Sequence, residues 1–162
     1  MNKLRVAIIN LSNDTNVGGL IRTSDAACVE EVIIVGRRKW NKSASTGSHL
    51  NLNIIKMRSD EEFIEYCNQK KYNIISVEIG DKSQNIFDFK YPKDTILVIG
   101  NEGTGVSKKI LENSYAKVYI PQYGDVECLN AAIAGSIAIY DFVRKNSNLK
   151  ENTPLGQKFI KK

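Results

Sequence analysis

The chain has 162 residues, 42% of them hydrophobic and 25% charged, with a formal net charge of +5. This length predicts one domain that buries a core without disulfides or a structural metal. No apolar run approaches the roughly 18 residues of a membrane span, and the amino terminus lacks the apolar region and cleavage site of a signal peptide. We therefore expect a cytoplasmic protein with no membrane partner. The excess of cations is a modest indication of a polyanionic partner.

Cysteine and histidine usage argues against a disulfide framework and against a metal site. The three cysteines, Cys28, Cys67 and Cys128, are widely spaced and form no C-x-x-C pair. His49 is the single histidine, which argues against a centre built on imidazole ligands. We expect no bound metal, and we treat His49 as incidental to function.

Strand-like and helix-like segments alternate along the chain. Short apolar, β-branched runs predict strands, whereas helical apolar spacing and charged caps predict helices. The expected strands are 4–10, 31–36, 50–57, 72–79, 95–100 and 116–121, and the expected helices are 17–28, 59–71, 107–113 and 129–145. This β-then-α order indicates an α/β fold, with a mostly parallel sheet and helices on both faces. Residues 1–146 would form one domain, followed by a basic, loosely held tail over 147–162.

Three segments that follow strands are the most informative, because open parallel sheets bind ligands beyond the carboxyl ends of their strands. In the first, N-V-G-G-L-I-R, we expect Asn16, Gly18 and Gly19 to open a helix. Arg22 lies about 200° around that helix from Leu20, so its cation would point away from the apolar stripe. The simpler alternative is an N-cap followed by a solvated arginine.

The second segment, V-I-G-N-E-G-T-G-V-S, is a glycine-rich loop between a strand and a helix. Its glycines would let the backbone approach a ligand closely. Val106 stands where a P-loop needs lysine, and the spacing G-x-G-x-x-G is also absent. The loop is therefore predicted to hold a ligand other than a triphosphate or dinucleotide, and a plain glycine-rich turn is the alternative.

The third segment is the turn D-V-E-C-L-N and the helix that follows it. Small residues predominate from Ala131 to Ala138, so another backbone can come close to this helix. Such a face can pack within one subunit or against its copy in a symmetric dimer. In the second case, we expect a bulky residue at Gly135 to disrupt the dimer.

Taken together and in this order, the segments N-V-G-G-L-I-R-T-S-D-A-A, L-V-I-G-N-E-G-T-G-V-S and Y-I-P-Q-Y-G-D-V-E-C-L-N resemble three motifs of one family. This is the SpoU (TrmH-type) family of RNA ribose 2′-O-methyltransferases, within the SPOUT superfamily. The resemblance extends over about residues 6–145. It implies a deep trefoil knot in the C-terminal part of the sheet, S-adenosylmethionine bound in that knot, and a homodimer.

The resemblance also implies which residues form the site. The catalytic candidates are the matches to the polar motif positions, namely Asn16, Arg22, Glu102 and Asn130. The cofactor-binding candidates are Gly100, Ile120, Cys128 and Leu129. Cys128 departs from the serine that the family usually has, and a thiol is a weaker hydrogen-bond donor than a hydroxyl.

Methyl transfer to a ribose hydroxyl depends on alignment and on a proton acceptor. A guanidinium resists deprotonation, so Arg22 is a poor base. Our hypothesis is that Arg22 grips the phosphate beside the target ribose, and that this phosphate helps to receive the proton. Glu102 and Asn130 would orient Arg22 and its loop.

RNA binding is expected from the basic loop G-R-R-K-W-N-K. It combines cations with an aromatic ring, as a groove for phosphates and a stacked base would, and its candidates are Arg37, Arg38, Lys39 and Trp40. The alternative is a solvated loop with Trp40 folded back on the core. We expect tRNA to be favoured over rRNA as substrate. The remaining alternatives are a catalytically silent RNA-binding module on the same fold and a small-molecule or nucleotide-binding α/β protein.

Overall fold

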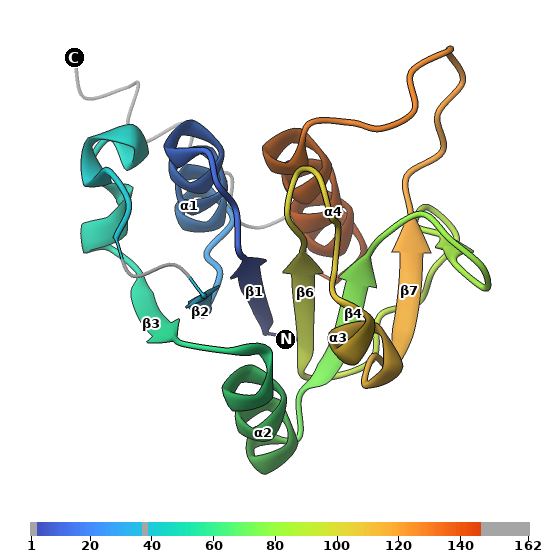
Figure 1. Ribbon diagram of the computed structural model, residues 1–162, viewed down its shortest axis with the longest axis horizontal. Coiled ribbons are helices and arrows are strands. Elements are labelled where there is room, and N and C mark those ends of the chain that lie inside the picture. Colours follow the sequence, from blue (N-terminus) through green and yellow to red (C-terminus); the bar gives the residue numbers. More distant parts are fainter. Residues whose placement is uncertain (1–2, 37–38, 147–162) are drawn as a thin grey trace.

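The computed structural model describes residues 3–36 and 39–146, which are arranged around one sheet (Figure 1). Its strands are β1 (Leu4–Ile9), β2 (Glu31–Val35), β3 (Asn53–Met57), β4 (Asn73–Val77), β5 (Gln84–Asn85), β6 (Thr95–Ile99) and β7 (Ala116–Tyr119). They lie in the order β3-β2-β1-β6-β4-β7-β5, and each neighbouring pair is parallel. The parallel α/β sheet predicted from the sequence is confirmed, with β5 as an additional edge strand.

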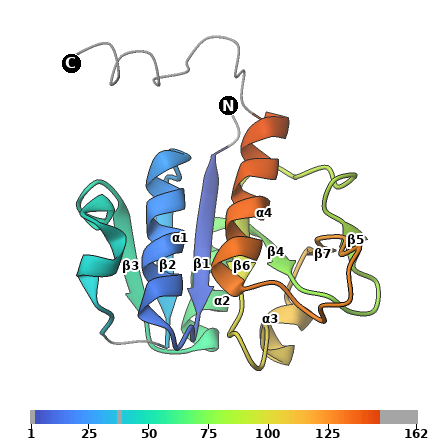
Figure 2. The ribbon, with the colours of Figure 1, turned by 90° about the horizontal axis from the view of Figure 1, so that it is seen from above.

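Helices cover both faces of the sheet, as predicted. The α-helices are α1 (Asp14–Ala26), α2 (Asp60–Lys70), α3 (Lys108–Glu112) and α4 (Ala131–Asn146), and two short 3₁₀ helices, η1 (Lys42–Ser45) and η2 (Ser48–Leu50), follow β2. One apolar core lies beneath α1 and α4, and the other lies beneath α2 and α3. Figure 2 shows α1 and α4 side by side over the same face. No helix in the described part of the chain has the length and apolar character of a bilayer-spanning segment.

Helix α1 begins earlier than the sequence predicted. Its N-cap is Asn13, whose side chain accepts a hydrogen bond of 2.8 Å from the backbone amide of Thr15. Asn16 and Gly18 therefore lie inside the helix instead of opening it. A Cβ atom on Gly18 would lie 2.4 Å from the backbone of Ala44. This glycine therefore serves the close packing of α1 against η1.

The small residues of α4 pack largely within the subunit. A Cβ atom on Gly135 would lie 2.4 Å from Leu20 of α1 and 3.0 Å from Ile99 of β6. A bulky residue at Gly135 would therefore disturb the core directly, and it is not the selective dimer test that the sequence suggested. Ile133 and Tyr140, which are 55% and 50% exposed, lie on the outer side of the same helix.

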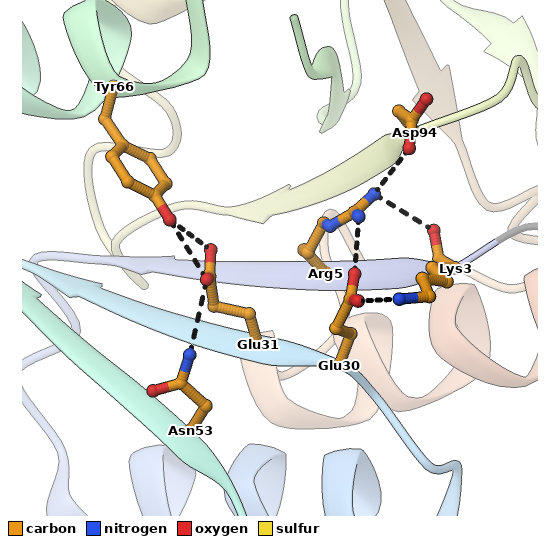
Figure 3. A network of polar contacts seen from close by, with 7 residues as sticks. All are labelled: Lys3, Arg5, Glu30, Glu31, Asn53, Tyr66 and Asp94. Carbon is orange, nitrogen blue, oxygen red and sulfur yellow. Dashed lines mark hydrogen bonds and ion pairs between the residues drawn. The ribbon is translucent and has the colours of Figure 1, made fainter. Parts of the chain in front are cut away.

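Ion pairs between charged residues connect the amino ends of the central strands (Figure 3). Arg5 is only 5% exposed, and it forms ion pairs with Glu30 and with Asp94, the latter at 3.2 Å. Its guanidinium also lies 4.2 Å from the centre of the Tyr72 ring. These contacts join β1 to the start of β2 and to the turn before β6. They lie at the opposite edge of the sheet from the strand ends where ligands are expected.

A second buried ionic group fastens the end of α4. Asp141 is 5% exposed, and its carboxylate accepts a hydrogen bond of 2.9 Å from the Tyr91 hydroxyl. It also pairs with Lys145 at 2.7 Å, and Lys145 donates to the carbonyl of Phe89 at 3.1 Å. Helix α4 is thereby held against the connection between β4 and β6. The trefoil knot implied by the resemblance stays a prediction.

Candidate active site

The loops that follow β1, β6, β4 and β7 meet at one edge of the sheet. These four strands are neighbours and all run parallel, so their carboxyl ends lie together. A cavity of about 510 Å³ opens there. It is lined by the loop after β6, the end of β4, and the segment that joins β7 to α4. Two of the three sequence motifs, the second and the third, thus form its walls.

Three polar side chains, one from each motif, form a continuous hydrogen-bonded chain. The Asn16 Nδ2 group donates to Glu102 Oε1 at 2.9 Å, and the Asn130 Nδ2 group donates to Asn16 Oδ1 at 3.0 Å. Asn130 Oδ1 in turn accepts from the backbone amide of Ala132 at 2.9 Å. A carboxylate can only accept and a backbone N–H can only donate, so both amides have a single satisfied orientation. This series of hydrogen bonds connects α1, the loop after β6 and the start of α4.

Glu102 is held in its ionised form by these contacts. Partial burial alone would raise the pKa of Glu102, but hydrogen bonds from Asn16 and from the backbone of Ser12 and Asn13 outweigh it and lower the pKa to about 2. The Ser12 and Asn13 amides lie 3.1 and 3.2 Å from the carboxylate, and the Ser12 hydroxyl adds a bond of 3.1 Å. Glu102 therefore carries a full negative charge near neutral pH.

These contacts differ from the role that the sequence suggested for Glu102 and Asn130. We expected both to orient Arg22, yet both bond to Asn16, and no described residue forms a hydrogen bond or ion pair with Arg22. Arg22 is exposed on α1, on the side away from buried Leu20, as its helical position predicted. It does not line the cavity in this chain. Its guanidinium is thus available to an anion on the protein surface.

The glycines of the β6 loop allow the loop to close on itself. A Cβ atom on Gly100 would lie 2.3 Å from the backbone of Gly105. Asn101 and Gly105 exchange two backbone hydrogen bonds, of 3.0 and 2.9 Å. Gly105 has φ +67°, a conformation that favours glycine. We expected these glycines to let the backbone come close to a ligand. In the structure, Gly100 and Gly105 instead let two parts of the loop pack against each other.

Glu78, at the end of β4, is a site residue that sequence reasoning missed. Its Oε2 accepts from the backbone amide of Val106 at 2.9 Å, and its Oε1 accepts from the amide of Ile79 at 3.0 Å. A Cβ atom on Gly105 would lie 2.3 Å from Glu78 Oε2. The only signal for Glu78 was its position near the carboxyl end of the predicted strand 72–79, because its contact with the β6 loop spans 28 residues.

All four cofactor-binding candidates line the cavity, namely Gly100, Ile120, Cys128 and Leu129. Gly100 and Ile120 are buried and form its inner wall, while Cys128 is exposed at its rim. Gln122 also lines the cavity and was not anticipated. The walls combine apolar side chains with a few polar groups, which is typical of small-molecule sites.

The basic loop is only partly described. Arg37 and Arg38 lie outside the described residues, as does the tail over 147–162. Lys39 is exposed. Trp40 is half-buried against the core beneath α1 and meets the ring of His49 edge-on, with 5.9 Å between ring centroids. The tryptophan thus folds back on the core, as the alternative interpretation of this loop anticipated, and only part of its ring is open to a base.

The charge of the cavity limits what it can hold. Glu78 and Glu102 both line it, and no lysine, arginine or histidine does so among the residues that the structure describes. A phosphate-bearing nucleotide would meet two carboxylates there without a compensating cation. A ligand with a net positive charge and an apolar body fits better. Within the described ranges, no group of three or more potential metal ligands occurs.

Comparisons with known proteins agree with this geometry. The model of the SpoU rRNA Methylase family matches residues 3–140. A tRNA (guanosine(18)-2′-O)-methyltransferase of Aquifex aeolicus is 32% identical over 141 residues, covering 84% of this chain and 66% of that protein. The chain thus spans about two thirds of the length of this curated relative.

Solved structures show the same fold. The A. aeolicus TrmH/SpoU tRNA modifying enzyme superposes with a TM-score of 0.83 at 28% identity, covering 99% of this chain and 87% of that one. The SpoU methyltransferase AviRb from Streptomyces viridochromogenes, solved in complex with the cofactor AdoMet, gives 0.82 at 26% identity and covers 89% and 60%. From the matching family model and these likenesses, we conclude that the chain belongs to the SpoU rRNA methylase family.

Proposed function

We propose that this protein is an RNA ribose 2′-O-methyltransferase that uses S-adenosylmethionine, acts in the cytoplasm and prefers tRNA to rRNA. The observation that carries the proposal is the hydrogen-bonded chain Glu102–Asn16–Asn130, which joins the three motif segments at the cavity. A protein that only bound RNA would not need these hydrogen bonds beside a cavity for a small molecule. The names of the relatives support tRNA as the substrate class.

The cavity suits S-adenosylmethionine in both its lining and its charge. This cofactor supplies a methyl group that is activated by a positively charged sulfonium. Gly100, Ile120 and Leu129 would hold its apolar and ring portions, because all three line the cavity. The two carboxylates of the lining would favour a cationic ligand. The absence of basic side chains from the described lining argues against the alternative of a nucleotide-binding protein.

The chain's own residues would act mainly by positioning. Glu102, Asn16 and Asn130 fix the relative positions of α1 and the two cavity loops. Arg22 would bind the phosphate next to the target ribose with its planar fork. That phosphate would help to accept the hydroxyl proton. Precise alignment of the ribose oxygen can supply several kcal/mol of rate acceleration.

RNA would be held by cations around the site. We propose that Arg37, Arg38 and Lys39 contact phosphates, with the exposed part of Trp40 beside them. We also propose a homodimer, with the outer side of α4, including Ile133 and Tyr140, at its interface. An exposed pair of large apolar side chains on one helix is a reasonable interface core.

The first experiment is methylation of tRNA and rRNA by the purified protein with labelled cofactor, followed by mapping of the modified nucleotide. Incorporation at a ribose 2′-hydroxyl of tRNA is the expected result. Arg22→Ala should reduce turnover at least about a hundredfold with little effect on cofactor affinity, because the charge acts chiefly in the transition state. Arg22→Lys should recover little of this activity.

Arg58→Ala provides a matched control, since Arg58 is exposed, does not line the cavity and precedes α2, the helix that covers the other face of the sheet. It should leave turnover unchanged. If Arg22→Ala raises only the KM for RNA, Arg22 is an ordinary RNA contact. If no RNA is methylated although the cofactor and RNA both bind, the catalytically silent alternative holds.

A further inference from the structure

The two carboxylates of the cavity are not equivalent. Each carboxylate oxygen can accept about two hydrogen bonds. Glu102 accepts four, two on each oxygen, from the backbone and side chain of Ser12, from the Asn13 amide and from Asn16. The hydrogen-bond acceptor capacity of Glu102 is therefore filled, and donors on the α1 side surround its charge.

Glu78 keeps unused acceptor capacity. Its two oxygens each accept one backbone amide, from Ile79 and Val106. Each oxygen therefore has about one further lone pair for a ligand. The side chain is half-buried and lines the cavity. No basic side chain within the described cavity lining offsets its charge.

The placement of this carboxylate is fixed from two directions. The Val106 amide holds Oε2, and the Cβ-free face of Gly105 lets the oxygen come close to the loop. A fixed charge at a partly dry surface acts on a ligand more strongly than a mobile charge in water does. Glu78 is thus a preorganised negative group in the lining of the cavity.

We propose that the Glu78 carboxylate sets the charge preference of this cavity, so that the cationic methyl donor binds more tightly than its neutral product. The inference rests on the proposed function, because it concerns the same cavity. When the methyl group moves to the ribose oxygen, the carbon–sulfur bond breaks and sulfur keeps its electron pair. The cofactor loses its sulfonium charge, and the hydroxyl proton leaves with the phosphate or water. Glu78 then attracts the spent cofactor less than a fresh one.

Calorimetry with two ligands that cannot transfer a methyl group tests this proposal without relying on activity. Sinefungin carries a protonated amine in place of the sulfonium, and S-adenosylhomocysteine is neutral at that position. The unmodified protein should bind sinefungin about three- to tenfold more tightly, allowing for solvent screening of a half-buried charge. A ratio near one would overturn the proposal.

Two variants separate charge from loop placement. Glu78→Gln keeps an oxygen for the Val106 amide but loses the charge, so the preference should fall to a ratio near one while S-adenosylhomocysteine binds almost as before. Glu78→Asp keeps the charge but is too short to hold Val106 in the same way. It should bind both ligands more weakly and retain the preference. If Glu78→Asp loses the preference for sinefungin and Glu78→Gln keeps it, loop geometry is the cause and the proposal is wrong.

Glu112→Gln is the matched control, because Glu112 is exposed on α3 and changes the net charge equally without lining the cavity. It should leave the ratio unchanged, and an equal loss of preference in this variant would also overturn the proposal. The failure of the proposed function gives a different result. In that case the unmodified protein binds neither ligand at millimolar concentration, and the inference fails with it. If both ligands bind with equal affinity, the proposal for Glu78 is refuted and the proposed function still stands.

Discussion

Glu102 acts as a structural anion on which the contact between β1, α1 and the β6 loop depends. Its pKa of about 2 lies below the ordinary value of 4.5, because the donors around the folded carboxylate outweigh its partial burial. A lowered pKa in the folded state adds stability above the unfolded pKa, and this stability is lost as the pH falls from about 4.5 toward 2. We estimate about 1–2 kcal/mol, discounted for the part of the side chain that reaches solvent.

Glu102→Gln should therefore be less stable than the unmodified protein at pH 6, and the difference should shrink by pH 3. Urea unfolding at both pH values measures the free energies of unfolding. Glu127→Gln, in the exposed segment before α4, is the control for a lost carboxylate. An undiminished difference at pH 3 would show that Glu102 contributes through shape alone.

At the scale of the helices, Asn130 both caps α4 and joins it to α1. Its Oδ1 accepts from the amides of Ala132 and Ile133, and its Nδ2 donates to Asn16. Asn130→Asp keeps the cap but loses the donor to Asn16, so it should lose less stability than Asn130→Ala while methylation falls. Asn130→Ala loses both and should cost about 1 kcal/mol of unfolding free energy as well. Equal stability losses in the two variants, measured by urea unfolding, would contradict this separation.

The other end of α4 depends on Asp141. Asp141→Asn removes a buried charge that pairs with Lys145 and accepts from Tyr91. Lys145 then loses its carboxylate partner in a largely buried place and keeps only backbone carbonyls as hydrogen-bond acceptors, so unfolding should become easier by about 2–3 kcal/mol, less than for a fully buried pair. Asp88→Asn, exposed in the same connection between β4 and β6, should be nearly neutral in the same thermal and urea unfolding measurements.

The sequence predicted most elements to within a few residues, because continuous apolar runs and terminal caps are local signals. It failed where the cause is long-range or ambiguous. Strand β5 has two residues and exists through pairing of Gln84 with Val118, which no local pattern reveals. The start of helix α1 was ambiguous because every residue of the run N-D-T-N can cap a helix, and the structure uses Asn13. Glu78 belongs to none of the three motifs. It reaches the cavity only because β4 pairs with β6 in the folded sheet.

In the whole molecule, stability and function are divided between the two edges of the sheet. At the amino ends, buried Glu31 accepts the single Tyr66 O–H, which lies 2.9 and 3.0 Å from its two carboxylate oxygens (Figure 3). Tyr66→Phe leaves this carboxylate short of donors and should lower the unfolding free energy by about 1–3 kcal/mol. Binding of S-adenosylhomocysteine, measured by calorimetry well below the unfolding temperature, should stay unchanged. A matching loss of affinity would show that the two edges are coupled.

The proposed homodimer sets the size of the RNA surface, since two copies with a net charge of +5 each offer a longer basic surface than one. Tyr140 is half exposed on the outer side of α4, beside Ile133, and a carboxylate buried there in a symmetric interface would face its own copy. Tyr140→Glu should therefore shift the protein to a monomer in light scattering at micromolar concentration. The matched variant Tyr115→Glu, at a position that is 65% exposed before β7, should leave the mass unchanged. A monomer for the unmodified protein would refute the dimer, whereas a dimer that persists in Tyr140→Glu would place the interface elsewhere.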